Sequence, residues 1–181
     1  MDENKKEATE TIETTIEAAQ TALLEIDVQV DTRVLYDYML YHMYHGMAGI
    51  LGTMVGLFLV AYYIGYGGSL LYLIGGIVVI LYLPVSLYMT AKKQALTNPA
   101  FKEPLHYAFT EEGIEVSQGD AHDSMKWSGM QKAVSTGKSI ILYTSKVNAS
   151  IFPRKACGDQ VINLISIIAT HMPPQKVKIR Q

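Results

Sequence analysis

The sequence contains a single cysteine, Cys157, among its 181 residues. One thiol cannot form a disulfide within the chain, and it excludes a metal site built from several cysteines. This composition suits a reducing compartment. The first twenty residues also lack an apolar run, so we expect no cleavable signal peptide at the start of the chain.

Charge is missing from the middle of the chain. Residues 38–91 include no Asp, Glu, Lys or Arg. A helix on the surface of a water-soluble protein rarely stays uncharged for more than a few turns, and about 20 apolar residues cross the hydrocarbon layer. We therefore expect a transmembrane hairpin over residues 46–91, with spans at about 46–65 and 69–89. Tyr66, Gly67 and Gly68 form the turn, where glycine tolerates positive φ.

Basic residues next to the spans predict the orientation of this hairpin. Arg33 precedes the first span and Lys92, Lys93 and Lys102 follow the second, whereas the turn is uncharged. Because Lys and Arg are enriched on the cytoplasmic side, we expect a multi-pass protein of the cell membrane with both termini in the cytoplasm.

The first span carries four glycines at steps of three or four residues. One face of the helix therefore presents the small residues that allow another helix to approach closely. One interpretation is packing on the second span near Gly75 and Gly76, and the other is dimerisation through the same face. The four glycines are Gly46, Gly49, Gly52 and Gly56.

The overall net charge of −2 conceals an asymmetry between the two flanks of the hairpin. Residues 1–37 carry ten acids and three bases, whereas residues 92–181 carry twelve bases and seven acids. The flanks can attract each other, the basic flank can face anionic lipid, or both can simply be solvated. The lysines are dispersed and no aromatic residues alternate with them, which disfavours nucleic acid as a partner.

The periodicity outside the hairpin predicts a small β domain. Residues 24–31 alternate apolar and polar side chains, as a half-buried strand does, and a helix over 33–45 leads from this strand into the membrane. Residues 1–23 form an acidic tail or weak helix, and 92–104 a connector. Short strands follow at 105–110, 114–117, 131–135, 139–144 and 149–152, with a further segment that ends at 127 between the second and third of these. A final helix, capped by Gly158 or Asp159, closes a domain over 105–172, before a basic tail over 173–181.

These elements predict an α+β membrane protein, in which a two-helix hairpin interrupts a small antiparallel β domain capped by a C-terminal helix. A single strand is unstable alone, so residues 24–30 must pair with the later strands. A meander of short strands plugged by one helix is the layout of pleckstrin-homology-like (PH-like) domains.

Three segments resemble the YcxB-like family of bacterial membrane proteins: residues 107–116, Met125-Lys126-Trp127-Ser128, and 151–156. The resemblance covers roughly residues 24–172. It implies two membrane helices and a PH-like cytoplasmic domain, and it supplies no catalytic residues. Where the family usually shows Pro-Lys-Arg, this chain has Pro153-Arg154-Lys155. Because Arg and Lys differ in how they bind ligands, we transfer no ligand contact from the family.

No group of residues in the sequence predicts catalysis. His42 and His45 lack a second pair to complete a metal or haem site, and adjacent Glu111 and Glu112 fit a solvated turn better than a catalytic carboxylate pair. We therefore expect no enzyme, no cofactor and no metal. The interaction candidates are Trp127, whose commoner role is core packing, together with Arg154, Lys155, Lys92 and Lys93.

The function we expect first is that of a non-enzymatic, membrane-anchored module or accessory subunit. It docks a protein partner, or a second copy of itself, at the cytoplasmic membrane face. One alternative is a lipid-sensing or surface-sensing module that binds anionic headgroups through its basic residues. A subunit of a small transporter or channel is a further alternative, although spans without charge form a poor ion path.

Overall fold

The computed structural model describes residues 22–146 and 148–180. The predicted acidic tail or weak helix therefore lies almost wholly outside the described residues. The chain divides into two compact units. The helical unit comprises residues 30–102, and the β unit comprises the described residues up to 29 together with those from 103 onward.

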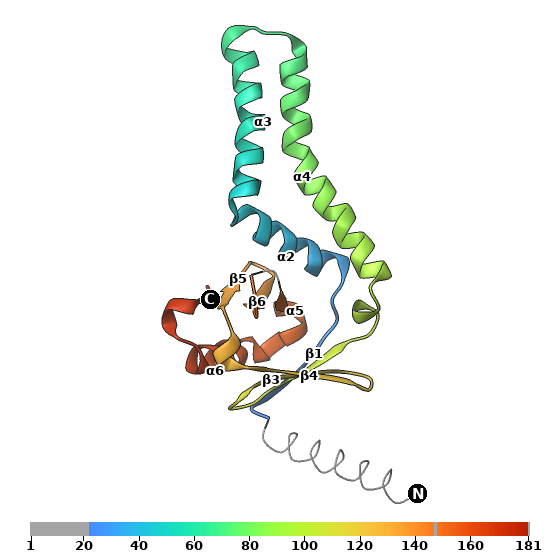
Figure 1. Cartoon of the computed structure of the whole chain (residues 1–181), viewed down its shortest axis with the longest axis vertical. Helices are drawn as coiled ribbons and strands as arrows, with labels where there is room; N and C mark the ends of the chain where they lie inside the picture. The colour runs from blue at the N-terminus through green and yellow to red at the C-terminus, as the bar shows by residue number, and fades with distance from the viewer. Residues whose placement is uncertain (1–21, 147, 181) are drawn as a thin grey trace, which may run out of the picture. The chain divides into compact units, whose positions relative to one another are not determined.

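The helical unit consists of α2 (Thr32–Tyr44), α3 (Met47–Tyr66) and α4 (Leu70–Thr97), followed by a 3₁₀ turn, η1 (Pro99–Phe101). Asp31 caps α2, because its side-chain oxygen accepts hydrogen bonds from the backbone N–H groups of Arg33 and Val34 at 2.9 and 2.8 Å. Helices α3 and α4 run side by side as a hairpin (Figure 1). At its tip Gly67 adopts a positive φ of 63°, the conformation that favours glycine.

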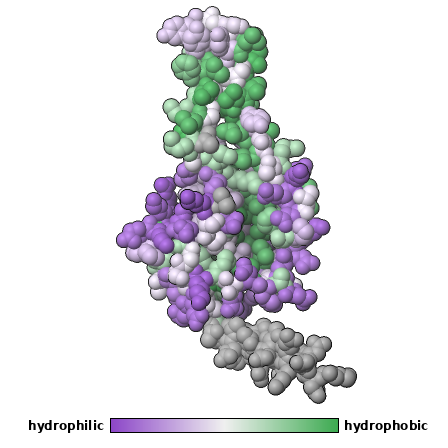
Figure 2. Space-filling view, viewed as in Figure 1, coloured by the Kyte–Doolittle hydropathy of each residue, from purple (hydrophilic) through white to green (hydrophobic). Residues whose placement is uncertain are grey.

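Both helices of the hairpin are long and apolar enough to cross a membrane. Their outer surfaces are apolar as well (Figure 2). Among the described residues, every exposed large hydrophobic side chain except Leu23 and Ile162 lies on α3 or α4. Water penalises such a surface, whereas lipid does not.

The second helix of the hairpin is longer than the predicted span, which ended at residue 89. It continues to Thr97, through Lys92 and Lys93. Residues 90–97 include Ala, Lys, Gln and Leu, which favour helix, so this segment is helical although it is polar. The helix ends at Asn98, because the residue before Pro99 is driven out of the helical region.

The β unit contains two four-stranded sheets. The first has the order β1 (Leu24–Val28), β2 (Leu105–Phe109), β3 (Gly113–Gln118) and β4 (Ala121–Lys126), and all its neighbours are antiparallel. The strand predicted before the hairpin does pair with a strand after it: Leu24 lies opposite Phe109 and Val28 opposite Leu105. Its side chains alternate between buried and exposed, as the sequence pattern predicts.

The second sheet has the order β7 (Ala149–Pro153), β6 (Ser139–Tyr143), β5 (Lys132–Ser135) and β8 (Val177–Lys178). Strand β8 corrects two expectations. It pairs with β5 in parallel, with Val177 opposite Ala133, so the domain is not purely antiparallel. The predicted basic tail is therefore partly a strand, because the exposed edge of β5 offers unpaired backbone groups.

The β unit also contains four short helical segments in addition to its C-terminal helix. A 3₁₀ turn, η2 (Trp127–Gly129), joins the sheets, and α5 (Arg154–Cys157) and η3 (Gly158–Gln160) precede α6 (Val161–His171), which η4 (Pro174–Lys176) follows. The predicted cap of the last helix is wrong. Gln160 occupies that position without a side-chain hydrogen bond, because Gly158 and Asp159 belong to the 3₁₀ turn η3 and α6 begins only at Val161.

The core of the β unit joins the two sheets through aromatic rings. Phe152 of β7 is completely buried, and its ring centroid lies 4.8 Å from that of Tyr107 and 5.4 Å from that of Phe109, both in β2. Leu164 and Ile168 bury one face of α6. The fold class is therefore mixed α+β, with a helical hairpin and two sheets closed by a C-terminal helix.

Candidate functional site

Three segments of the β unit that meet through hydrogen bonds to their backbones carry four basic residues, hereafter the basic cluster: Lys138, Arg154, Lys155 and Arg180. The Arg154 guanidinium donates from Nη2 to the Arg180 carbonyl oxygen at 2.6 Å. The Arg154 backbone N–H donates to the Lys138 carbonyl oxygen at 2.8 Å. Lys138, Lys155 and Arg180 are exposed, and Arg154 is half-buried.

Local hydrogen bonds hold the backbone of the basic cluster in place. The Thr136 side-chain oxygen accepts from the backbone N–H groups of Lys138 and Ser139 at 3.1 and 2.9 Å, which closes the β5–β6 turn. The Arg180 backbone N–H donates to the Ser135 hydroxyl at 2.8 Å. This last bond follows from the parallel pairing of β8 with β5, which carries the tail alongside the turn.

No residue of the basic cluster forms an ion pair with an acidic side chain in the part of the chain that the structure describes. The two ion pairs within the described residues join His106 to Asp27 and His171 to Glu111, and neither involves a residue of the cluster. Neighbouring positive charges without acids attract anions, and the attraction weakens as salt is added. An Arg guanidinium suits phosphate or carboxylate oxygens through its fixed fork of donors.

Cys157 lies at the end of α5, three residues after Arg154, and is buried. Burial raises the pKa of its thiol to about 11, although the nearby charge of Arg154 lowers it. The thiol is therefore protonated at neutral pH and a poor nucleophile. This cysteine packs in the core rather than forming a reactive site.

Trp127, an interaction candidate from the sequence, lies in the core and is only 7% exposed. Its indole N–H donates to the Thr110 carbonyl oxygen at 2.9 Å. Its ring also stacks on that of His171, with centroids 4.9 Å apart and 19° between the planes. This burial leaves little of the indole available to a partner.

Sequence reasoning missed a contact between Glu111 and His171. The imidazole Nε2 lies 2.9 Å from a Glu111 carboxylate oxygen, although the two residues are 60 positions apart. Only the docking of α6 beside the β2–β3 turn brings them together, so no local sequence pattern predicts this contact.

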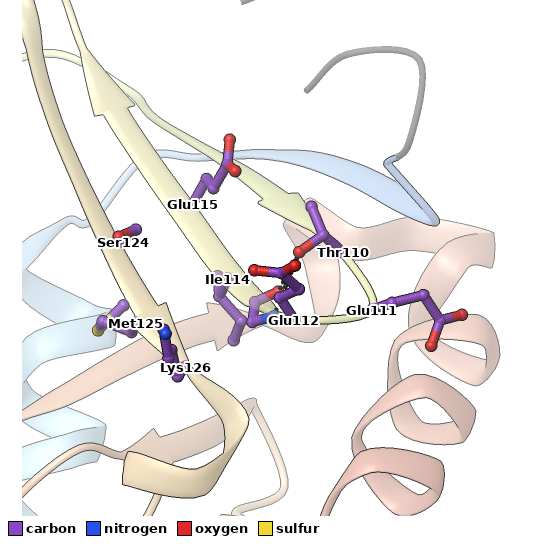
Figure 3. A pocket seen from close by; sticks show the side chains of 9 residues that line it. Thr110, Glu111, Glu112, Ile114, Glu115, Ser124, Met125 and Lys126 are labelled. Atoms are coloured by element: carbon purple, nitrogen blue, oxygen red, sulfur yellow. Dashed lines mark hydrogen bonds between the residues drawn. The ribbon is translucent and has the colours of Figure 1, made fainter. Parts of the chain in front are cut away.

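The same turn lines one side of a pocket of about 350 Å³ (Figure 3). Gly113 permits the close approach of β3 to β4 there, because a Cβ at this position would overlap the Met125 carbonyl oxygen. The polar residues that line the pocket are Thr110, Glu111, Glu112, Glu115, Ser124 and Lys126.

Comparison with known families gives one match. Residues 109–165, about a third of the chain, match the family model described as YcxB-like protein. This segment is YcxB-like. No curated protein and no solved structure matches the chain.

The YcxB-like segment runs from the end of β2 into α6. It contains Lys138, Arg154 and Lys155 of the basic cluster, whereas Arg180 lies beyond it. The resemblance inferred from the sequence is thus confirmed for residues 109–165. The basic cluster is completed by a residue outside the matched segment.

The other predicted site residues lie in the helical unit. Lys92 and Lys93 are exposed near the end of α4. A Cβ on Gly56 would come within 2.6 Å of Ile80 and 2.9 Å of the Gly76 carbonyl oxygen, and one on Gly52 within 3.0 Å of Leu83. Gly52 and Gly56 therefore pack against α4 within one chain.

Gly46 and Gly49 lie instead at the elbow between α2 and α3. A Cβ on Gly49 would meet the Met43 carbonyl oxygen at 2.6 Å, and one on Gly46 would lie 3.4 Å from the same atom. His42 and His45 stack on tyrosines of their own helix. Among the described residues, no group of three or more His, Cys, Asp or Glu side chains could hold a metal ion.

Proposed function

We propose that this protein is a two-span membrane protein whose β unit binds the anionic surface of the membrane through the basic cluster. The observation that carries this proposal is that the β5–β6 turn, α5 and the C-terminal tail meet and together carry four basic residues, none of which forms an ion pair with an acidic residue among the described residues. Each Lys or Arg near an anionic leaflet contributes about 1 kcal/mol.

The proposed membrane anchor is the α3–α4 hairpin. Helices of 20 and 28 residues are about 30 and 42 Å long at 1.5 Å per residue, and each reaches across a hydrocarbon core of about 30 Å. The basic residues of the helical unit are Arg33, Lys92, Lys93 and Lys102, all remote from the uncharged tip. The enrichment of Lys and Arg on the cytoplasmic side favours both termini in the cytoplasm.

The tether makes weak headgroup contacts effective. A domain anchored by its own hairpin meets the lipid surface at a high effective concentration, so a few kcal/mol suffice to hold it there. Lys92 and Lys93 add positive charge at the end of α4. We infer a binding role without catalysis, and we propose the PH-like layout because two sheets and a closing helix are compatible with it.

The test reconstitutes the full-length protein in nanodiscs of neutral phosphatidylcholine, or of the same lipid with about a third of phosphatidylglycerol. A dye on Gly137→Cys reports energy transfer to acceptors on the headgroups. Gly137 lies in the exposed β5–β6 turn, whereas the buried Cys157 thiol reacts poorly with maleimides. We expect stronger transfer in anionic discs and a decline as salt is added.

The variant for this test is Lys138→Glu combined with Lys155→Glu. Neither side chain forms an ion pair with an acidic residue in the described part of the chain, so the fold should tolerate both changes. The matched control is Lys126→Glu on β4, which is also exposed. Energy transfer that is equal in neutral and anionic discs, or unchanged by the double variant, would contradict the proposal.

Docking of a protein partner or a second copy, the first expectation from the sequence, ranks second here. Its support is β4, an edge strand with exposed side chains that can accept another strand. The glycine face that favoured self-assembly is occupied by α4 of the same chain at Gly52 and Gly56. Native mass spectrometry of the detergent-solubilised protein distinguishes these functions, because a stoichiometric protein partner would move docking to first place.

A further inference from the structure

His171, the last residue of α6, contacts three different parts of the β unit. Its Nδ1 lies 2.9 Å from the Ile167 carbonyl oxygen, one turn earlier in the same helix. Its Nε2 lies 2.9 Å from Glu111 Oε2 in the β2–β3 turn. The ring also stacks on Trp127 of η2, and its side chain is only 13% exposed, against 76% for that of Glu111.

The number of protons on the imidazole decides whether both hydrogen bonds form. A carbonyl oxygen and an ionised carboxylate are both acceptors, so each ring nitrogen of His171 must donate. Neutral imidazole carries one N–H and satisfies one of them, whereas the imidazolium carries two and satisfies both. Beside an ionised Glu111, the two short distances are both satisfied as hydrogen bonds when His171 is protonated.

The surroundings favour the charged form. Burial lowers the pKa of His171, but the bonds to Glu111 and Ile167 and the charge of Glu111 together raise it above the ordinary value of 6.5. The C-terminal end of a helix favours a cation, and so does the indole face.

The other charged groups nearby are few. Glu112 follows Glu111 in the turn, and Lys126 precedes Trp127. Helix α6 carries no ionisable side chain besides His171. Glu111 is the acid that both contacts His171 and raises its pKa.

We propose that Glu111, His171 and Trp127 form a proton-controlled latch that fastens the C-terminal end of α6 to the β2–β3 turn. With His171 protonated, α6 and the turn are joined by a charge-assisted hydrogen bond. When the proton leaves, the ring keeps at most one of its two bonds and the turn separates from α6. Glu111 also lines the pocket beside that turn (Figure 3), so the latch controls one wall of it.

The stack supplies a direct reporter, because Trp127 is the only tryptophan in the chain. A protonated imidazole quenches the fluorescence of an indole that it touches, whereas a neutral one quenches far less. We expect the emission of the full-length protein in detergent micelles to rise with pH, with a midpoint above 6.5.

Three variants test whether the change in Trp127 emission is caused by deprotonation of His171. Glu111→Gln removes the carboxylate and should shift the midpoint downward, and His171→Phe keeps the stack and should abolish the transition. The matched control is His106→Gln, which removes the other histidine that pairs with an acid and should leave the midpoint unchanged.

A second measurement uses NMR. The NMR titration of ¹³C-labelled histidine in the wild-type protein should show the His171 imidazole titrating with a midpoint above 6.5. Amides at the end of α6 and in residues 110–113 should lose exchange protection in Glu111→Gln at pH 5.5. An emission that does not change with pH, or a midpoint equal in wild type and Glu111→Gln, would overturn the latch.

Discussion

Replacing Phe152 by Ala tests whether the two sheets of the β unit share one core. The side chain is 0% exposed, and its ring contacts Tyr107 and Phe109 across the sheets. Removing a buried phenylalanine costs about 3–5 kcal/mol of unfolding free energy. Each aromatic pair contributes about 0.5–1.5 kcal/mol beyond its buried area, so we expect a loss in the upper half of that range.

The assay is urea unfolding of the full-length protein in detergent, followed through Trp127 fluorescence. Trp127 reports this core directly, because its ring lies 6.4 Å from that of Phe109. The control is Ile162→Ala on α6, since Ile162 is 77% exposed and its removal should cost less than about 0.5 kcal/mol. A loss below about 1.5 kcal/mol for Phe152→Ala would refute the shared core.

Three further outcomes are expected from the structure. Gly56→Leu should destabilise the hairpin by about 1–3 kcal/mol in thermal unfolding in detergent, whereas Gly75→Leu, where a side chain meets open space, should not. Cys157 should react with maleimide at pH 7 only after denaturation, because its pKa is raised to about 11. The free energy of unfolding should decrease as pH rises through the raised pKa of His171 and reach its full value below 6.5, and Glu111→Gln should flatten this dependence in urea titrations.

Some of the fold could be predicted because it depends on local patterns. The charge-free run indicates two apolar helices whatever the rest of the chain does, and the glycines at residues 67 and 68 indicate their turn. Alternation over residues 24–31 predicts a strand, and its need for a partner predicts pairing with a strand after the hairpin. The end of the second helix was misplaced because polar residues 90–97 continue it by their helix propensity.

The features that carry the proposals depend on tertiary structure instead. Arg154 could be selected from the sequence as a basic residue, but Lys138 joins it only because β6 pairs with β7. Arg180 joins it only because β8 pairs in parallel with β5. A two-residue strand has too little pattern of its own to be recognised, and its position depends on the free edge of β5.

The same reasoning explains the latch. From the sequence alone, Glu111 is interpreted as a solvated turn residue and His171 as the end of a helix. Only the docking of α6 brings the imidazole Nε2 within 2.9 Å of the Glu111 carboxylate. The sequence alone determined the apolar hairpin and which side chains of residues 24–28 are buried, because periodicity and composition act over a few neighbouring residues. Tertiary structure alone decided which distant charges meet, because only the packing of sheets and helix sets those distances.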